Sequence, residues 1–230
     1  MEARVMTPFQ VRVLDILFDS GLGERNYYFT GGTALAEFYL QHRYSDDLDV
    51  FTRVSRIIKG DYLEIKRLLE QAGLEVFSEI EDDEFVRFYV RAPNQVNERL
   101  KVEFGRYAGA QMSPPRHFGT VVVDSFEDIA VNKVCAIYGR SPSESKDFVD
   151  LFFILRESKF TLDYLVGRAR EKEAPFDHEE AILEFATNLR GVKELHRLPR
   201  MIKPLTLEEL QADLIPKAEA IIRRLAPARS

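Results

Sequence analysis

The chain has little cysteine, no tryptophan, no long hydrophobic run and no large excess of charge. Its single cysteine, Cys135, among 230 residues excludes an intrachain disulfide framework and any zinc site built only from cysteines. No uninterrupted apolar run is long enough to span a bilayer, and no charged-then-apolar leader stands at the start. From these absences we expect a soluble cytoplasmic protein with no membrane partner.

The charge balance excludes one class of polyanion-binding protein. The chain carries 32 Lys and Arg against 38 Asp and Glu, a net charge of -6. A protein coated in positive charge and held to nucleic acid or anionic lipid by bulk attraction is therefore excluded, whereas a local basic patch is not. Residues 190–203 are locally basic, with Glu194 the one acidic residue among them. This segment is a candidate surface for a polyanion or an acidic partner, and a solvated loop is the alternative.

The hydrophobic pattern predicts two kinds of structure along the chain. Up to residue 120, helical spacing alternates with short apolar or aromatic runs. We expect strands at 27–30, 48–52, 74–79, 85–91 and 99–106, a short apolar run at 120–123, and helices at 7–18, 33–42 and 57–72. After residue 125 nearly everything has helical spacing, at 126–138, 146–157, 161–172, 178–189 and 207–225. The sequence therefore predicts an α+β protein, with a mixed-sheet domain over 1–120 and a helical bundle over 121–230.

Two aspartates carry the strongest chemical signal. In the predicted strand 48–52 and the residue before it, Asp47 and Asp49 point to one face while Leu48 and Val50 point into the core. The two Cα atoms then lie roughly 6–7 Å apart, and the like charges repel by about 2.5 kcal/mol at an effective dielectric near 20. A divalent cation would offset this repulsion, and oxygen-only ligation suits Mg²⁺ or Mn²⁺.

A third carboxylate is available from another predicted strand. Glu103 lies on the face opposite Leu100, Val102 and Phe104, and it would stand beside the aspartates if the two strands are neighbours. Three carboxylates on adjacent strands can hold two metal ions about 3.5–4 Å apart, an arrangement that serves in-line phosphoryl transfer. A solvated strand edge is the plainer interpretation of the aspartate pair.

The turn before the first long helix supplies a candidate phosphate site. Gly31 and Gly32 join the strand 27–30 to the helix, so backbone N–H groups can approach a phosphate closely. Thr33 and Ser45 each offer a hydroxyl to a phosphate oxygen. An ordinary turn is the plainer interpretation of the glycine pair.

These residues carry a resemblance to a known family. Gly31 and Gly32, followed after 14 residues by the Asp-Leu-Asp at 47–49, resemble the nucleotidyltransferase superfamily of the DNA polymerase β type. The wording Phe-Thr-Gly-Gly-Thr-Ala-Leu at 29–35, with His-Arg-Tyr-Ser-Asp-Asp-Leu-Asp at 42–49, is similar to the AbiEii/AbiGii toxin family within it. That family also has a lysine on a helix of its second part, followed by a basic-Asp-x-x-Asp element. Lys133 and the stretch from Asp147 to Asp150 resemble these.

The resemblance implies a mechanism and a set of roles. It implies transfer of a nucleoside monophosphate from an NTP to an acceptor hydroxyl, in a toxin of a toxin–antitoxin or phage-defence system. Catalytic roles fall to Asp47, Asp49, Glu103, Lys133 and Asp147, with Asp47, Asp49 and Glu103 as ligands of Mg²⁺ (or Mn²⁺). Gly31, Gly32, Thr33, Arg43 and Ser45 would hold the nucleotide. Lys133 would neutralise phosphate charge, and Asp147 would position Lys133 or the acceptor hydroxyl.

Some choices stay open at the level of sequence. Lys146 stands where arginine is usual before Asp147, so either Arg140 or Lys146 fills the basic role of the second part. Candidate acceptors are tRNA or a protein, and a cognate antitoxin is a candidate partner. The alternatives are a nucleotidyltransferase-fold binding protein without catalysis, and an enzyme that modifies a small molecule such as an antibiotic.

Overall fold

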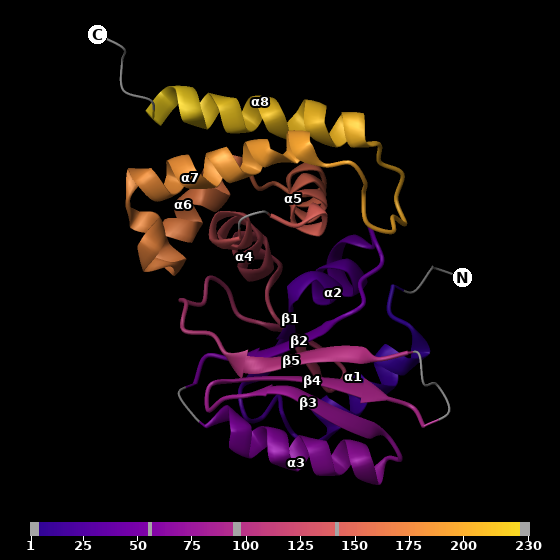
Figure 1. Ribbon diagram of the computed structural model, residues 1–230. Coiled ribbons are helices and arrows are strands. Elements are labelled where there is room, and N and C mark those ends of the chain that lie inside the picture. Colours follow the sequence, from indigo (N-terminus) through magenta and orange to yellow (C-terminus); the bar gives the residue numbers. More distant parts are fainter. Residues whose placement is uncertain (1–4, 55–56, 94–97, 141–142, 226–230) are drawn as a thin grey trace. The chain divides into compact units, whose positions relative to one another are not determined.

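The computed structural model describes residues 5–54, 57–93, 98–140 and 143–225 (Figure 1). By its internal contacts the chain divides into two compact units. The first comprises Met1–Tyr39, Ser45–Gly109 and Pro114–Ser125, and the second comprises Leu40–Tyr44, Ala110–Ser113 and Phe126–Ser230. The second unit thus takes two short pieces of chain from between segments of the first. That residues 1–120 and 121–230 form separate domains stays a prediction.

The first unit is built on a seven-stranded mixed sheet with the strand order β3-β4-β5-β2-β1-β7-β6. The strands are β1 (Tyr27–Thr30), β2 (Leu48–Thr52), β3 (Glu75–Glu81), β4 (Phe85–Arg91), β5 (Leu100–Arg106), β6 (Arg116–Phe118) and β7 (Val121–Val123). β2 pairs antiparallel with β1 and parallel with β5. β3 and β4 form an antiparallel hairpin. The predicted α+β class is confirmed.

Two helices cover the apolar face of this sheet. They are α1 (Pro8–Asp19) and α3 (Ile58–Gln71). α1 begins at a capping box. The backbone N–H of Gln10 donates to the Thr7 hydroxyl, and the backbone N–H of Thr7 donates to Oε1 of Gln10, which satisfies two donors that have no partner within the helix. The Tyr27 hydroxyl donates to Asp61 of α3 at 2.6 Å, which anchors the helix to the sheet. The face of the sheet under α3 therefore forms the core of this unit.

The helical stretch after β1 is less regular than expected, and it begins and ends two residues earlier than the predicted helix 33–42. α2 (Gly31–Leu35) continues into a π-helical turn, η1 (Ala36–Leu40). Gln41 then has a positive φ of 48° and ends the helical stretch two residues before the predicted end. Figure 1 shows α2 on the side of the sheet opposite α3.

The second unit is helical. Its helices are α4 (Phe126–Gly139), α5 (Ser145–Glu157), α6 (Leu162–Lys172), α7 (Glu179–Arg190) and α8 (Leu207–Leu225), with short 3-10 turns at Ala174–Asp177 and Gly191–Glu194. α4 packs against α5, α6 and α7, and α8 packs against α7 and α5. α4 is buried on most of its circumference, as a central helix of a bundle should be. No helix in the described residues is long and apolar enough to cross a membrane.

Buried charges tie the two short pieces to this unit. The Asp128 carboxylate accepts from the backbone N–H groups of Met112 and Ser113 at 3.0–3.2 Å, and it pairs with the buried Lys172 at 2.7 Å. The piece Leu40–Tyr44 pairs with the segment before α8, since the Tyr44 N–H donates to the carbonyl of Arg200 at 2.9 Å. These contacts explain why both pieces belong to the helical unit although their neighbours in sequence do not.

Candidate active site

Adjacent parallel strands bring two of the predicted carboxylates together. β2 and β5 pair so that Asp49 is opposite Glu103 and Leu48 is opposite Val102. Leu48 and Val102 are fully buried, which leaves Asp49 and Glu103 on the other face. Asp47 immediately precedes β2. The expectation that these two strands are neighbours is confirmed.

The first glycine of the pair is required by the Asp49 side chain. Gly31 has a φ of +76°, a backbone conformation that favours glycine. A Cβ at this position would lie 1.9 Å from Oδ2 of Asp49. The glycine therefore lets the carboxylate lie against the backbone of the turn, and this contact connects two parts of the motif that are 18 positions apart in the sequence.

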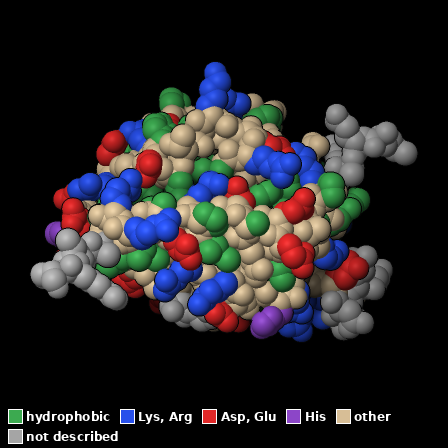
Figure 2. Space-filling view, turned by 90° about the horizontal axis from the view of Figure 1, so that it is seen from above, with side chains coloured by type: hydrophobic (Ala, Val, Ile, Leu, Met, Phe, Trp, Pro, Cys, Tyr) green, Lys and Arg blue, Asp and Glu red, His purple; other side chains and the backbone are tan. Residues whose placement is uncertain are grey.

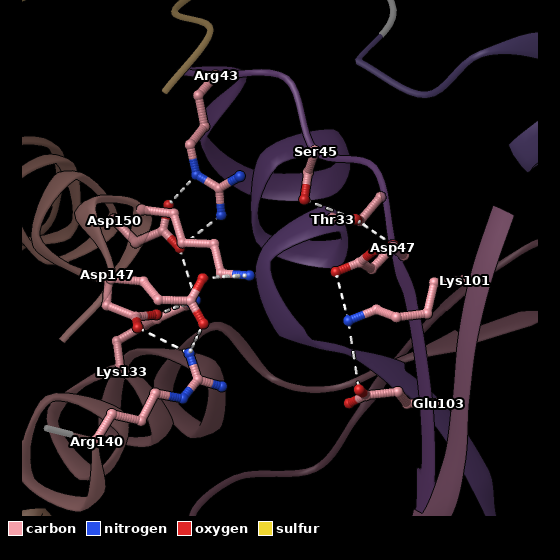
Figure 3. A network of polar contacts seen from close by, with 12 residues as sticks. Thr33, Arg43, Ser45, Asp47, Lys101, Glu103, Lys133, Arg140, Asp147 and Asp150 are labelled. Atoms are coloured by element: carbon pink, nitrogen blue, oxygen red, sulfur yellow. Dashed lines mark hydrogen bonds and ion pairs between the residues drawn. The ribbon is translucent and has the colours of Figure 1, made fainter. Parts of the chain in front are cut away.

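The two predicted hydroxyl groups lie together and hold the approach to β2. The Thr33 side chain is buried, and its hydroxyl contacts Oγ of Ser45 at 2.8 Å and the carbonyl of Asp47 (Figure 3). Gln10 of α1 donates to the carbonyl of Ser45 at 2.9 Å. These bonds fix the backbone that carries Asp47. That Thr33 and Ser45 bind phosphate stays a prediction.

A lysine that the sequence analysis missed lies among the carboxylates. Lys101 Nζ is 2.9 Å from Oδ2 of Asp47 and 3.4 Å from Oε1 of Glu103 (Figure 3). Burial alone would lower the pKa of Lys101, but the hydrogen bond and charge of Asp47 and the charges of Glu103 and Asp49 raise it above its usual value. Lys101 is two residues before Glu103 on the same strand, so period-2 alternation already placed both on one face.

The donor set fits a hard divalent cation in kind. The side chains of Asp47, Asp49 and Glu103 all offer carboxylate oxygens, which Mg²⁺ and Mn²⁺ prefer. The Lys101 ammonium, itself a cation, bridges Asp47 and Glu103. In the described residues no three His, Cys, Asp or Glu side chains are gathered closely enough to hold a metal ion. The carboxylates are thus present, with an ammonium group between two of them.

A second cluster lies within the helical unit, on α4 and α5. Lys133 Nζ is 3.1 Å from Oδ1 of Asp147 and 2.7 Å from Oδ2 of Asp150 (Figure 3). Both aspartates are fully buried and Lys133 is 7% exposed. The two aspartates therefore do not form an exposed acidic face. Burial opposes the charge on Lys133, but the two aspartates outweigh it and raise the lysine pKa.

Asp150 is the centre of this cluster. Arg43 donates to it through Nε at 2.6 Å and Nη2 at 2.8 Å, and His42 Nε2 lies 2.7 Å from it. Burial would raise the pKa of Asp150, yet Lys133 and Arg43 hold it well below its usual value. Arg43, predicted to hold the nucleotide, has its guanidinium on Asp150 instead. No sequence signal identified this contact, because the two residues are 107 positions apart.

The structure distinguishes the two candidates for the second basic residue. Arg140 Nη1 is 2.8 Å from Oδ2 of Asp147, on the oxygen that Lys133 leaves free. Lys146 pairs with Glu144 at 3.0 Å. Arg140 is therefore the residue that joins the Lys133 cluster.

The basic segment 190–203 is partly structured. Met201 forms an isolated β-bridge with Arg43, and Lys203 pairs with Glu157 at 2.6 Å. Arg197 and Arg200 are exposed. On the face drawn in Figure 2, Lys and Arg side chains are interspersed with Asp and Glu side chains and do not form one continuous patch. That this segment meets a polyanion stays a prediction.

Three of the solved structures to which the chain is similar are bacterial proteins. A protein from H. pylori assigned as a nucleotidyltransferase is 21% identical, with a TM-score of 0.58 over 96% of this chain and 97% of that one. JHP933 from Helicobacter pylori is 20% identical, with a TM-score of 0.57 over 96% and 94%. MenT4, the nucleotidyltransferase toxin Rv2826c of Mycobacterium tuberculosis, is 16% identical, with a TM-score of 0.49 over 94% and 85%. No curated protein sequence matches the chain.

A family model covers nearly the whole sequence. The model described as nucleotidyl transferase AbiEii toxin, type IV TA system, matches residues 12–227. Its range includes the Gly31 turn, Asp47, Asp49 and Glu103 of the sheet unit, and the cluster on α4 and α5. The chain therefore belongs to the AbiEii family of nucleotidyl transferase toxins of type IV toxin–antitoxin systems, and it is a nucleotidyltransferase.

Proposed function

We propose that this nucleotidyltransferase transfers a nucleoside monophosphate from an NTP to an acceptor hydroxyl with the help of Mg²⁺. Asp47, Asp49 and Glu103 would hold the cation, with Mn²⁺ as a substitute of the same ligand preference. When bound, the cation supplies Lewis-acid stabilisation of the charge that develops on the phosphate oxygens. The chain itself supplies a fixed carboxylate frame and the hydroxyls beside it.

One observation carries the proposal: the Asp49 carboxylate lies on the Gly31 turn and opposite Glu103. A Cβ at Gly31 would lie 1.9 Å from Oδ2 of Asp49, and this close approach supports one shared site for the turn and the carboxylate. The register of β2 and β5 brings Glu103 beside Asp49. A phosphate held by the turn would therefore be next to the carboxylates that hold its cation.

The remaining residues have separate proposed roles. Gly32, Thr33 and Ser45 would hold the triphosphate, and Lys133 would neutralise phosphate charge. The contact of Asp147 with both Lys133 and Arg140 supports a positioning role for Asp147. Because Arg43 is buried on Asp150, we propose that it positions the Lys133 cluster and does not itself contact the nucleotide.

The acceptor and the partner are further parts of the proposal. A tRNA is the acceptor that we would test first, with protein acceptors second. The family description names a type IV toxin–antitoxin system, which implies a cognate antitoxin.

The test is a labelling experiment with matched variants. The purified chain is incubated with each α-³²P-labelled NTP, Mg²⁺ and total tRNA, and the products are separated on denaturing gels. We expect label in an acceptor, and we expect Asp47→Asn and Asp49→Asn each to reduce it at least about 100-fold. Asp83→Asn is the control, because it removes the same charge from the exposed turn between β3 and β4. Labelling that survives both site variants would contradict the assignment of the metal ligands.

A further inference from the structure

Lys101 occupies the position among the carboxylates that a cation would take. Its ammonium contacts Asp47 at 2.9 Å and Glu103 at 3.4 Å, and the charge of Asp49 also acts on it. Figure 3 shows the ammonium between the two carboxylates, reached from β5 by the extended lysine stem. A single positive group therefore neutralises carboxylates from two different segments of the chain.

The pairing of Glu103 makes Lys101 the main counter-charge of Asp47. Glu103 is also bound by Arg87 of β4, with Nη2 at 2.8 Å and Nε at 2.9 Å from Oε1. Among the described residues, Asp47 has no arginine partner and contacts Lys101 directly. Arg87 lies on the far side of Glu103 in the strand order β4-β5-β2, so its charge is further from Asp47.

We propose that Lys101 is an internal counter-cation of the carboxylate site, which a divalent cation must displace from Asp47 and Glu103. The inference rests on the proposed function, in which these carboxylates bind the metal. Lys101 then sets how tightly the free protein binds a divalent cation. It also keeps the carboxylates from repelling one another when no metal is bound.

The surroundings of Lys101 allow this exchange. Its side chain is 27% exposed, so the ammonium has a route to water when it leaves Asp47. A lysine stem has four rotatable methylene groups and a compact charged end, which makes it easier to displace than a bidentate arginine. A partly exposed ammonium–carboxylate contact is weak enough to be exchanged for a cation with two charges.

The experiment measures metal binding in the absence of any nucleotide. Mn²⁺ is titrated into the wild-type chain, Lys101→Met and Lys101→Arg, with free Mn²⁺ followed by electron paramagnetic resonance. Lys59→Met is the matched control, because Lys59 forms a surface pair with Glu81 at 3.7 Å and its loss changes the net charge equally. We expect Lys101→Met to bind Mn²⁺ about fivefold to tenfold more tightly than wild type. Lys101→Arg should bind Mn²⁺ no more tightly than wild type, because its guanidinium keeps the counter-charge and is harder to displace. Lys59→Met should stay within about twofold of wild type.

Thermal unfolding distinguishes exchange from a purely structural role. Without metal, Lys101→Met should unfold at a lower temperature than wild type, since its three carboxylates then lack a shared counter-charge. Saturating Mn²⁺ should remove that difference. A difference that persists unchanged with Mn²⁺ would contradict the proposal.

The outcomes also separate this inference from the proposed function. If wild type and Lys101→Met bind Mn²⁺ equally, the role of Lys101 is wrong while the metal site stands. If Lys59→Met tightens binding as much as Lys101→Met, the effect belongs to net charge and the inference is again overturned. If neither wild type nor Lys101→Met binds Mn²⁺, the proposed metal site fails together with the inference.

Discussion

Gly31 shows how one residue fixes the geometry of a catalytic motif. Two separate features of this position require glycine. The positive φ is disfavoured for any residue with a Cβ, and a Cβ would also collide with the Asp49 carboxylate. Gly73, at the end of α3, has nearly the same φ of +78° but nothing within 4 Å of a Cβ. The two glycines therefore separate backbone strain from steric contact.

We predict that Gly31→Ala abolishes nucleotidyl transfer, whereas Gly73→Ala leaves it within about twofold of wild type. Each change should cost about 1–2 kcal/mol of unfolding free energy for the left-handed backbone. Gly31→Ala should cost about 1–3 kcal/mol more, because Asp49 must move away from the new methyl group. Urea unfolding and the labelling assay measure both effects. Equal behaviour of the two variants would show that the Asp49 contact does not matter.

At the scale of elements, α5 organises the second cluster. Asp147 and Asp150 are three residues apart and so share a helix face, as the sequence predicted. The structure turns that face inward, toward Lys133 of α4. Arg140 follows α4 and reaches Asp147 while remaining 47% exposed. On α5, the buried Asp147 therefore pairs with Lys133 and Arg140. The buried Asp150 has three basic partners, which are Lys133, Arg43 and His42.

We predict that Arg140→Met reduces nucleotidyl transfer roughly tenfold, because Asp147 loses the partner that fixes its second oxygen. Lys146→Met removes the same charge six residues away and should leave activity within about twofold of wild type, because in the described residues Lys146 pairs with Glu144 and not with Asp147. Initial rates at saturating NTP give the comparison. The reverse ranking would identify Lys146 as the basic residue of the motif.

Elements with a clear apolar pattern could be predicted from the sequence, and those without one could not. β2 and β4 were predicted with their observed bounds because their alternate residues are buried. β6 was missed, since Arg116, His117 and Phe118 are all exposed and only pairing with β7 makes them a strand. The hydrophobic pattern of a short segment does not show which strand it pairs with.

The candidate site divides in the same way. Asp47, Asp49 and Glu103 could be placed on one face by alternation, and Asp147 and Asp150 by helical spacing. Period-2 spacing also contained Lys101, although its contact with Asp47 depends on the pairing of β2 with β5. The contact of Arg43 with Asp150 joins distant segments, and only the folded chain reveals it.

At the scale of the molecule, the net charge does not show that some of the acidic side chains are buried and paired with basic ones. Among the described residues, four aspartates are fully buried: Asp124, Asp128, Asp147 and Asp150. Each has a basic partner, with Arg53 on Asp124 and Lys172 on Asp128. Buried pairs of this kind are costly to break from one side. The stability of the helical unit should therefore depend on the protonation of groups in its interior.

His42 is the buried histidine of this interior, and an unburied histidine titrates near pH 6.5. His42 is fully buried, and burial is the main cause of its lowered pKa, with Arg43 and Lys133 adding to the effect against the attraction of Asp150. Its Nδ1 has no hydrogen-bond partner within the described structure, so protonation would also bury an unpaired N–H. An unfolded histidine takes up a proton near pH 6.5, whereas the folded one does so only at lower pH. The stability that this shift represents is complete above pH 6.5 and is lost as the pH falls through the folded pKa.

We predict that wild type loses unfolding free energy below about pH 6.5, with a slope from His42 of at most about 1.4 kcal/mol per pH unit. His42→Gln keeps a donor near the position of Nε2 but cannot titrate, so its stability should vary less between pH 6.5 and 5. His196→Gln, at an exposed position, should retain the wild-type dependence. Urea unfolding at each pH, followed by circular dichroism because the chain has no tryptophan, gives the slopes. Parallel curves for wild type and His42→Gln would contradict the assignment.

Asp150 should cause a further loss of unfolding free energy below about pH 4 in both proteins. There the aspartate of the unfolded chain takes up a proton, whereas Lys133 and Arg43 keep the folded Asp150 ionised to lower pH. The loss should remain in His42→Gln because the depressed pKa of Asp150 comes chiefly from these two residues.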